Sequence, residues 1–168
     1  MAAGNTYTQI ASTTLGSAAS SVTFSSIAGT YTDLVLVVQA SLTLDAGDLA
    51  LQFNGDTATN YSMTYLTGTG SAASSGRETS KAFITCDWNS GVTTSQGNTM
   101  HIMNIMNYAN ATTYKTVLAR GNHAATGTDA VVGLWRSTSA INSILIKTAN
   151  TKTFAVGSLF NLYGITAA

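Results

Sequence analysis

Short apolar segments rich in β-branched and aromatic residues recur along this chain of 168 residues. Turn-forming residues separate these segments at intervals of roughly 8–12 residues, as in all-β proteins. No segment keeps the apolar period of an amphipathic helix over three turns. Because the chain contains no proline, Gly, Asn, Asp, Ser and Thr must form its turns. The pattern predicts an all-β fold of about ten short strands, an antiparallel β-sandwich that we expect to be jelly-roll-like.

The clearest strand–turn–strand pattern covers residues 131–146, where two apolar runs flank the polar residues 137–140. We expect Trp135 to anchor this tight turn to the core. Residues 33–41 form a continuous apolar run, which predicts a central strand buried on both faces. Residues 6–15 alternate apolar and polar side chains, as is typical of an edge strand. Further strands are expected at residues 22–27, 49–53, 81–88, 98–108, 113–120, 152–156 and 158–165.

Three other segments complete the predicted organisation. Residues 54–56 (Asn-Gly-Asp) are the strongest turn signal, residues 61–66 fit either a strand or a helical turn, and residues 67–76 predict an exposed loop. Residues 1–8 are expected to be an N-terminal arm or a lead-in to the first edge strand, and residues 9–168 a single domain. The N-terminus lacks a basic region followed by an apolar run, so no signal peptide is expected.

The charge content is low for a globular chain. Charged residues make up 8% of the sequence, and 7 basic residues balance 7 acidic residues. Without clustered Lys and Arg we expect no binding to nucleic acid. No apolar run approaches the roughly 18 residues that span a bilayer, so no membrane partner is expected. A net charge of zero indicates that the chain functions within an assembly.

The sequence offers no catalytic or cofactor motif, and we expect the protein not to be an enzyme. A G-x-S-x-G motif is absent, and neither His101 nor His123 lies in a recognisable catalytic pattern. Alternation places His101 on one sheet face with Met103 and Ile105. The single Cys86 excludes an intrachain disulfide and is expected to be a buried strand residue.

Three acidic residues are candidate ligands for a metal ion. Asp45, Asp48 and Asp56 fall in or near expected loops, where oxygen ligands for calcium can gather. The D-x-[DN]-x-[DN]-G pattern of a calcium loop is absent, and so is Cys and His spacing for a transition metal. We therefore interpret the three residues as turn formers and predict no metal.

Four aromatic residues are candidates for a ligand or interface site: Tyr61, Tyr65, Trp88 and Tyr108. In one interpretation their rings form a platform that stacks on sugars, with hydrogen bonds from Asn54, Asp56 and Asn60. In the other, which we favour, the rings fill the core or an interface between subunits.

Four stretches, in order, resemble small structural proteins of tailed bacteriophages, common among phages of cyanobacteria and other aquatic bacteria. They are residues 7–41 (YTQIASTTLGSAASSVTFSSIAGTYTDLVLVVQAS), 53–71 (FNGDTATNYSMTYLTGTGS), 133–144 (GLWRSTSAINSI) and 158–165 (SLFNLYGI). The resemblance spans nearly the whole chain, and its motifs are structural rather than catalytic. The run MHIMNIMNY at residues 100–108 departs from the pattern.

The resemblance implies a virion structural protein that is assembled in the host cytoplasm and released by lysis. One implied role is head decoration, in which a homo-oligomer, with a trimer favoured, bridges major capsid subunits and residues 1–8 add a strand to a neighbour. The alternative is a tail or fibre tip protein that partners other tail proteins and binds host-surface glycans through Tyr61, Tyr65 and Trp88. A chain of this length without a helical shaft favours decoration.

Overall fold

The computed structural model describes residues 6–89, 91–94 and 99–166. Within these residues the chain forms twelve strands and no helix. In chain order the strands are β1 (Tyr7–Thr14), β2 (Ser21–Phe24), β3 (Asp33–Ala40), β4 (Leu49–Phe53), β5 (Tyr61–Gly68), β6 (Ala73–Lys81), β7 (Ile84–Thr85), β8 (Thr99–Met106), β9 (Lys115–His123), β10 (Gly127–Trp135), β11 (Ile144–Thr148) and β12 (Leu159–Ile165).

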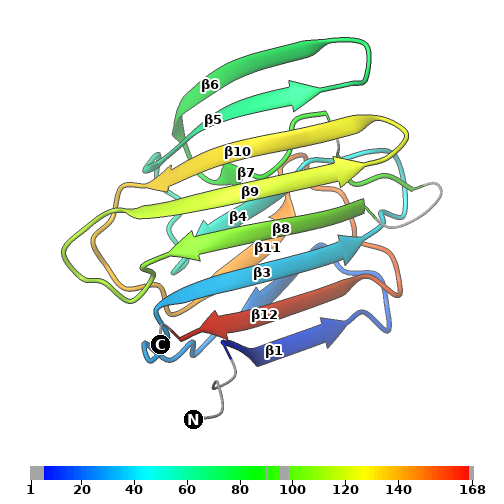
Figure 1. The fold of residues 1–168 in the computed structure, drawn as a ribbon. Helices are drawn as coiled ribbons and strands as arrows, with labels where there is room; N and C mark the ends of the chain where they lie inside the picture. Colours follow the sequence, from blue (N-terminus) through cyan, green and yellow to red (C-terminus); the bar gives the residue numbers. More distant parts are fainter. Residues whose placement is uncertain (1–5, 90, 95–98, 167–168) are drawn as a thin grey trace.

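Two antiparallel sheets pack as a sandwich, which confirms the predicted fold class (Figure 1). The larger sheet has eight strands in the order β1-β12-β3-β8-β9-β10-β5-β6, and the smaller has four in the order β2-β11-β4-β7. A single hydrophobic core lies between the two layers. The jelly-roll form is consistent with this order and stays a prediction.

Strand alternation explains how β3 contributes to the core. Leu34, Leu36 and Val38 point toward the smaller sheet and are buried. On the opposite side Val35 is buried, Val37 is half-buried and Gln39 is exposed. The strand is interior, between β12 and β8, as predicted. The expected burial on both faces holds at Val35 but is wrong at Val37 and Gln39, because no second layer of the described residues covers that side.

The predicted hairpin at residues 131–146 is a crossover between the two sheets. Strand β10 ends at Trp135 in the larger sheet, and β11 begins at Ile144 in the smaller. Both strands turn apolar side chains to the shared core, and residues 136–143 bridge the space between the layers. The side chain of Asn54 holds this bridge: its amide donates to Ala140 O at 2.8 Å, and its oxygen accepts the N–H of Asn142 at 2.9 Å. Trp135 is buried, as expected.

The exposed loop predicted at residues 67–76 is also wrong in its form. Strands β5 and β6 form a hairpin with a short turn at residues 69–72, and β6 is the edge of the larger sheet. Backbone pairing with β5 gives this Ser- and Gly-rich segment its regular structure even though its side chains are mostly exposed. Within the predicted loop, only residues 69–72 lie outside a strand.

The structure also tests the predicted edge strand at the N-terminus and three of the other predicted strands. Strand β1 is an edge strand, as predicted, and its pairing with β12 already includes Tyr7 and Thr8. Residues 1–5 of the predicted arm, and residue 98 of the strand expected at 98–108, lie outside the described residues. The strand expected at 81–88 shrinks to β7, and that at 152–156 to a bridge at Phe154.

Two glycine-containing positions set local geometry. The predicted Asn54–Gly55 turn is confirmed, with φ of 53° and 69° in the left-handed region that these residue types tolerate best. Gly133 allows β7 to lie against β10, because a Cβ there would come within 2.6 Å of a side-chain carbon of Ile84.

Candidate functional site

The four aromatic candidates do not form one platform. Tyr61 is buried, accepts a hydrogen bond from the N–H of Phe53 at 3.0 Å and stacks on Trp135 with ring centroids 6.2 Å apart. Tyr108 is buried, and its hydroxyl donates to Ala28 O. Neither ring is open to solvent, so a sugar platform that includes them is wrong, and both occupy the core.

Tyr65 and Trp88 form a separate pair. Their rings stack with centroids 4.1 Å apart and an interplanar angle of 14°. The phenol of Tyr65 also lies over Gly76, where a Cβ would come within 2.3 Å of the hydroxyl oxygen. Trp88 is 38% exposed. The pair fastens the segment after β7 to β5, and only Trp88 keeps a substantial exposed surface.

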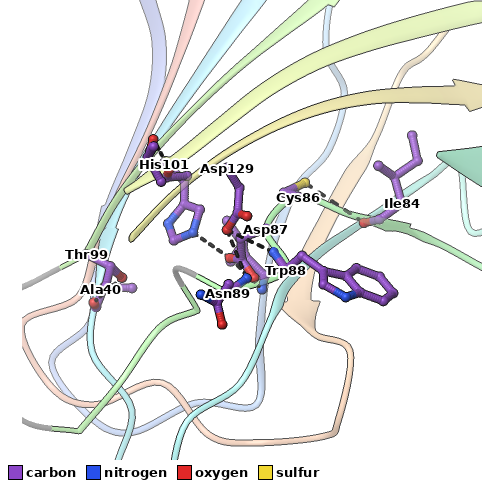
Figure 2. Close-up of polar contacts among 12 residues, drawn as sticks. Ala40, Ile84, Cys86, Asp87, Trp88, Asn89, Thr99, His101 and Asp129 are labelled. Carbon is purple, nitrogen blue, oxygen red and sulfur yellow. Dashed lines mark hydrogen bonds and ion pairs between the residues drawn. The ribbon is translucent and has the colours of Figure 1, made fainter. Parts of the chain in front are cut away.

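Three buried ionisable side chains, Asp87, His101 and Asp129, come together inside the sandwich, and the half-buried Asp48 adjoins them. We call these four residues the buried polar cluster. Asp48 directly precedes β4, Asp87 follows β7, His101 lies on β8 and Asp129 lies on β10. His101 shares the inner face of β8 with Met103 and Ile105, as predicted. Figure 2 shows His101 and Asp129 directed toward Asp87 and the backbone that follows it.

The carboxylates of Asp87 and Asp129 accept hydrogen bonds from backbone N–H groups. Nε2 of His101 lies 2.5 Å from Oδ2 of Asp87, and both side chains are fully buried. The same Asp87 oxygen accepts the N–H of Leu49 at 3.1 Å. Oδ2 of Asp129 accepts the N–H groups of Trp88 and Asn89, each at 3.0 Å. Buried N–H groups need such partners, so the cluster clamps the segment after β7 onto both sheets.

Asp48 makes the cluster sensitive to protons. Burial, reinforced by the neighbouring carboxylates of Asp87 and Asp129, raises the pKa of Asp48 to about 7, although His101 opposes the shift. A carboxyl group with this pKa is protonated in a large fraction of molecules at neutral pH. The proton limits the repulsion among three acidic groups in one buried region.

The arrangement is that of a structural clamp. The His101–Asp87 pair is fully buried and offers no surface for a substrate. Within residues 6–89, 91–94 and 99–166, no group of three or more His, Cys, Asp or Glu side chains is arranged to hold a metal ion. The three acidic residues considered as a calcium site do not gather: Asp45 pairs with Lys152 at 2.8 Å, and Asp56 accepts the indole N–H of Trp135 at 2.7 Å.

Sequence reasoning missed most of the cluster. Period-two alternation places Asp129 on the same side of its strand as Val131 and Trp135, so its burial was detectable from the sequence. No sequence signal links Asp129 to Asp87 or to His101, because these residues lie on strands or loops whose proximity is set by the sheet order.

The opposite side of the eight-stranded sheet carries the second notable surface, which we call the outer face. Figure 1 looks onto it, with the smaller sheet behind. Strand pairing places Leu118 beside Val132, and Ala130 beside Leu66. Leu66, Leu118 and Val132 are 57%, 44% and 51% exposed.

A hollow of about 740 Å³ lies on the outer face. Its apolar lining includes Tyr7, Val35, Leu66, Ile102, Leu118 and Val132, and its lining residues include one charged side chain, Arg120. Met100 and Met106 also point outward and are partly exposed, whereas Met103 lies in the core. The Met-rich run therefore contributes to both regions.

Comparison with protein-family models and with curated proteins finds no match for this chain. No helix in the part of the chain that the structure describes is long and apolar enough to cross a membrane.

Proposed function

We propose that this chain is a structural protein of a tailed-bacteriophage virion. Its role is that of a capsid decoration protein, a homo-oligomer with a trimer favoured, which bridges major capsid subunits. The observation that carries the proposal is the outer face, an exposed set of apolar side chains on a regular sheet. Contiguous exposed apolar surface on a single chain is typical of a protein-interaction site.

The sequence resemblance and the charge balance support the same role. A surface with few charges suits contact with several neighbours more than it suits a free, concentrated monomer. A decoration protein that contacts several subunits at once stabilises a shell through modest individual contacts, because each further contact forms at high effective concentration. Such a protein is located in the virion after assembly in the host cytoplasm.

The alternative is a tail or fibre tip protein that binds host glycans. Its support is weaker, because Tyr61 and Tyr108 are buried and Tyr65 stacks on Trp88. Trp88 is then the one ring of the four candidates with a substantial exposed surface for a sugar.

Cryo-electron microscopy of intact virions tests the proposal. We expect density for the sandwich over the capsid lattice, at three-fold or quasi-three-fold positions. Density confined to the tail or its fibres would contradict the decoration role and favour the alternative. A glycan-binding screen of the wild-type protein and Trp88→Ala would then test that alternative.

A further inference from the structure

Arg120 is the charged side chain among the residues that line the apolar hollow of the outer face. On one side its cross-strand neighbour is Ile102 of β8, and on the other it is Ala130 of β10. Leu66 continues the same row on β5. Arg120 is exposed, and within the described residues its guanidinium has no hydrogen-bond or ion-pair partner.

The row beside Arg120 is apolar at its centre. Leu118 and Val132 are cross-strand neighbours, flanked by Asn104 on β8 and Thr64 on β5. Both apolar side chains are about half exposed. Leu118 precedes Arg120 by two residues on β9, so the two rows are adjacent on the outer face. An occupant of the hollow therefore contacts leucine, valine and isoleucine side chains on both sides of one guanidinium.

The charge of the hollow specifies the occupant further. No carboxylate lines it, and no ion pair of the described residues involves Arg120, so the positive charge of Arg120 is not balanced by this part of the chain. A guanidinium binds a carboxylate through parallel hydrogen bonds, and this contact strengthens when a bound apolar surface excludes water. An occupant that buries the leucine and valine side chains without offering a carboxylate would leave Arg120 desolvated and unpaired, which is costly.

We propose that the outer face binds an apolar segment of another protein and that this segment brings a carboxylate to Arg120. The inference rests on the proposed function, because it names the chemistry of the partner that a bridging protein would contact. Arg77 on β6 is also exposed, and its cross-strand neighbour is Thr64 in the row of Leu118 and Val132. A second copy of this chain that presented its own outer face would therefore bring Arg77 and Arg120 toward positive charge. Charge complementarity therefore favours a different, acidic partner.

Binding of three labelled peptides to the purified full-length protein, measured by fluorescence anisotropy, tests the proposal. The probe is an end-blocked peptide of nine residues with several leucine and valine residues and a central glutamate; its counterparts carry glutamine or lysine at the centre. We expect the glutamate peptide to bind about fivefold more tightly than the glutamine peptide, the size of a good exposed ion pair, and the lysine peptide to bind most weakly.

Three variants assign the contacts. Arg120→Gln should remove the preference for glutamate over glutamine, and Leu118→Asn should weaken all three peptides about tenfold, as expected for loss of a buried leucine contact. Leu44→Asn is the matched control, because Leu44 is 71% exposed and does not line the hollow. It should bind like the wild type. Circular dichroism verifies that each variant is folded.

Absence of peptide binding, equal binding of the glutamate and glutamine peptides, or an unchanged preference in Arg120→Gln would overturn the inference. Self-association that is lost in Leu118→Asn, without peptide binding, would assign the outer face to a second copy and also overturn it. The proposed function is tested separately by its position on virions. If Leu118→Asn and Arg120→Gln decorate capsids as well as the wild-type protein does, the inference is refuted and the proposed function stands.

Discussion

The two sides of the eight-stranded sheet depart from the usual distribution of residues in opposite directions. On the inner side, Asp87, His101 and Asp129 are buried, whereas on the outer side Leu66 and Leu118 are exposed. The buried groups find partners within the chain, in one another and in backbone N–H groups. No second layer of the described residues packs over the exposed apolar groups. The comparison shows that the inner groups pair with one another and with the backbone, although Nδ1 of His101 and Oδ1 of Asp87 have no hydrogen-bond partner among the described residues. The outer region has the character of half an interface.

Removing one partner of the buried polar cluster should have the largest effect. Asp87→Ala leaves His101 and the N–H of Leu49 buried without their acceptor. We expect the free energy of unfolding to fall by about 3–5 kcal/mol, the usual cost of breaking a buried pair from one side. Urea unfolding at pH 7, followed by tryptophan fluorescence, measures the change. Asp87→Asn, which keeps an acceptor, should lose less; a loss below about 1 kcal/mol in Asp87→Ala would show that the pair is not a clamp.

A smaller and more local effect is expected at Asp129. Asp129→Ala removes the acceptor for the N–H groups of Trp88 and Asn89. The expected loss is about 2–3 kcal/mol, and hydrogen exchange should accelerate at these two amides more than at amides in the centre of β8. Asp129→Asn retains one acceptor oxygen and serves as the control. Uniform acceleration across the larger sheet would contradict a local role.

The third prediction concerns pH and Asp48. Its pKa is raised from 3.8 to about 7 on folding, so the folded chain holds the proton more tightly. The stability that this proton contributes is complete below pH 3.8 and is lost as the pH rises through about 7. Solvent reaches Asp48 in part, so the loss between pH 5 and pH 8 should be on the order of 1 kcal/mol.

Urea unfolding at these two pH values measures the effect, and Asp48→Asn should reduce the difference. Asp45→Asn is the matched control. Hydrogen bonding and attraction to Lys152 lower the pKa of Asp45, so its contribution changes only under more acidic conditions. Equal pH dependence in the wild type and Asp48→Asn would remove Asp48 as its source.

The smallest effect on stability is expected on the outer face. Leu118→Asn should change the free energy of unfolding by no more than about 0.5 kcal/mol, because the side chain has no layer packed over it. The same denaturation measurement, with Val117→Asn on the inner face of the same strand as reference, sharpens the contrast. Val117 is fully buried, so its substitution should be strongly destabilising. Comparable losses at the two positions would mean that the outer face is already covered.

Strand positions and inward-facing side chains were largely predictable. The alternation that placed His101 with Met103 and Ile105 is a local property of the chain, and so is the left-handed turn at Asn54–Gly55. The form of residues 67–76 was not predictable, because small polar side chains carry little strand preference. Their pairing with β5 depends on a neighbouring strand.

The site was less predictable than the fold. Aromatic residue type alone could not distinguish Tyr61 and Tyr108, which are buried, from Trp88, which is partly exposed. Likewise, the charge of Asp87 says nothing about which buried groups surround it.

Local physics therefore made the all-β class and the turn chemistry readable along the chain, because backbone preference and side-chain alternation act over a few residues. Sheet membership was decided by tertiary structure: β10 and β11 are close in sequence yet belong to different sheets. The buried polar cluster and the outer face arise in the same way, since each gathers residues from strands that are distant in sequence. The free energy of those contacts depends on which strands become neighbours, a choice made by packing of the whole core.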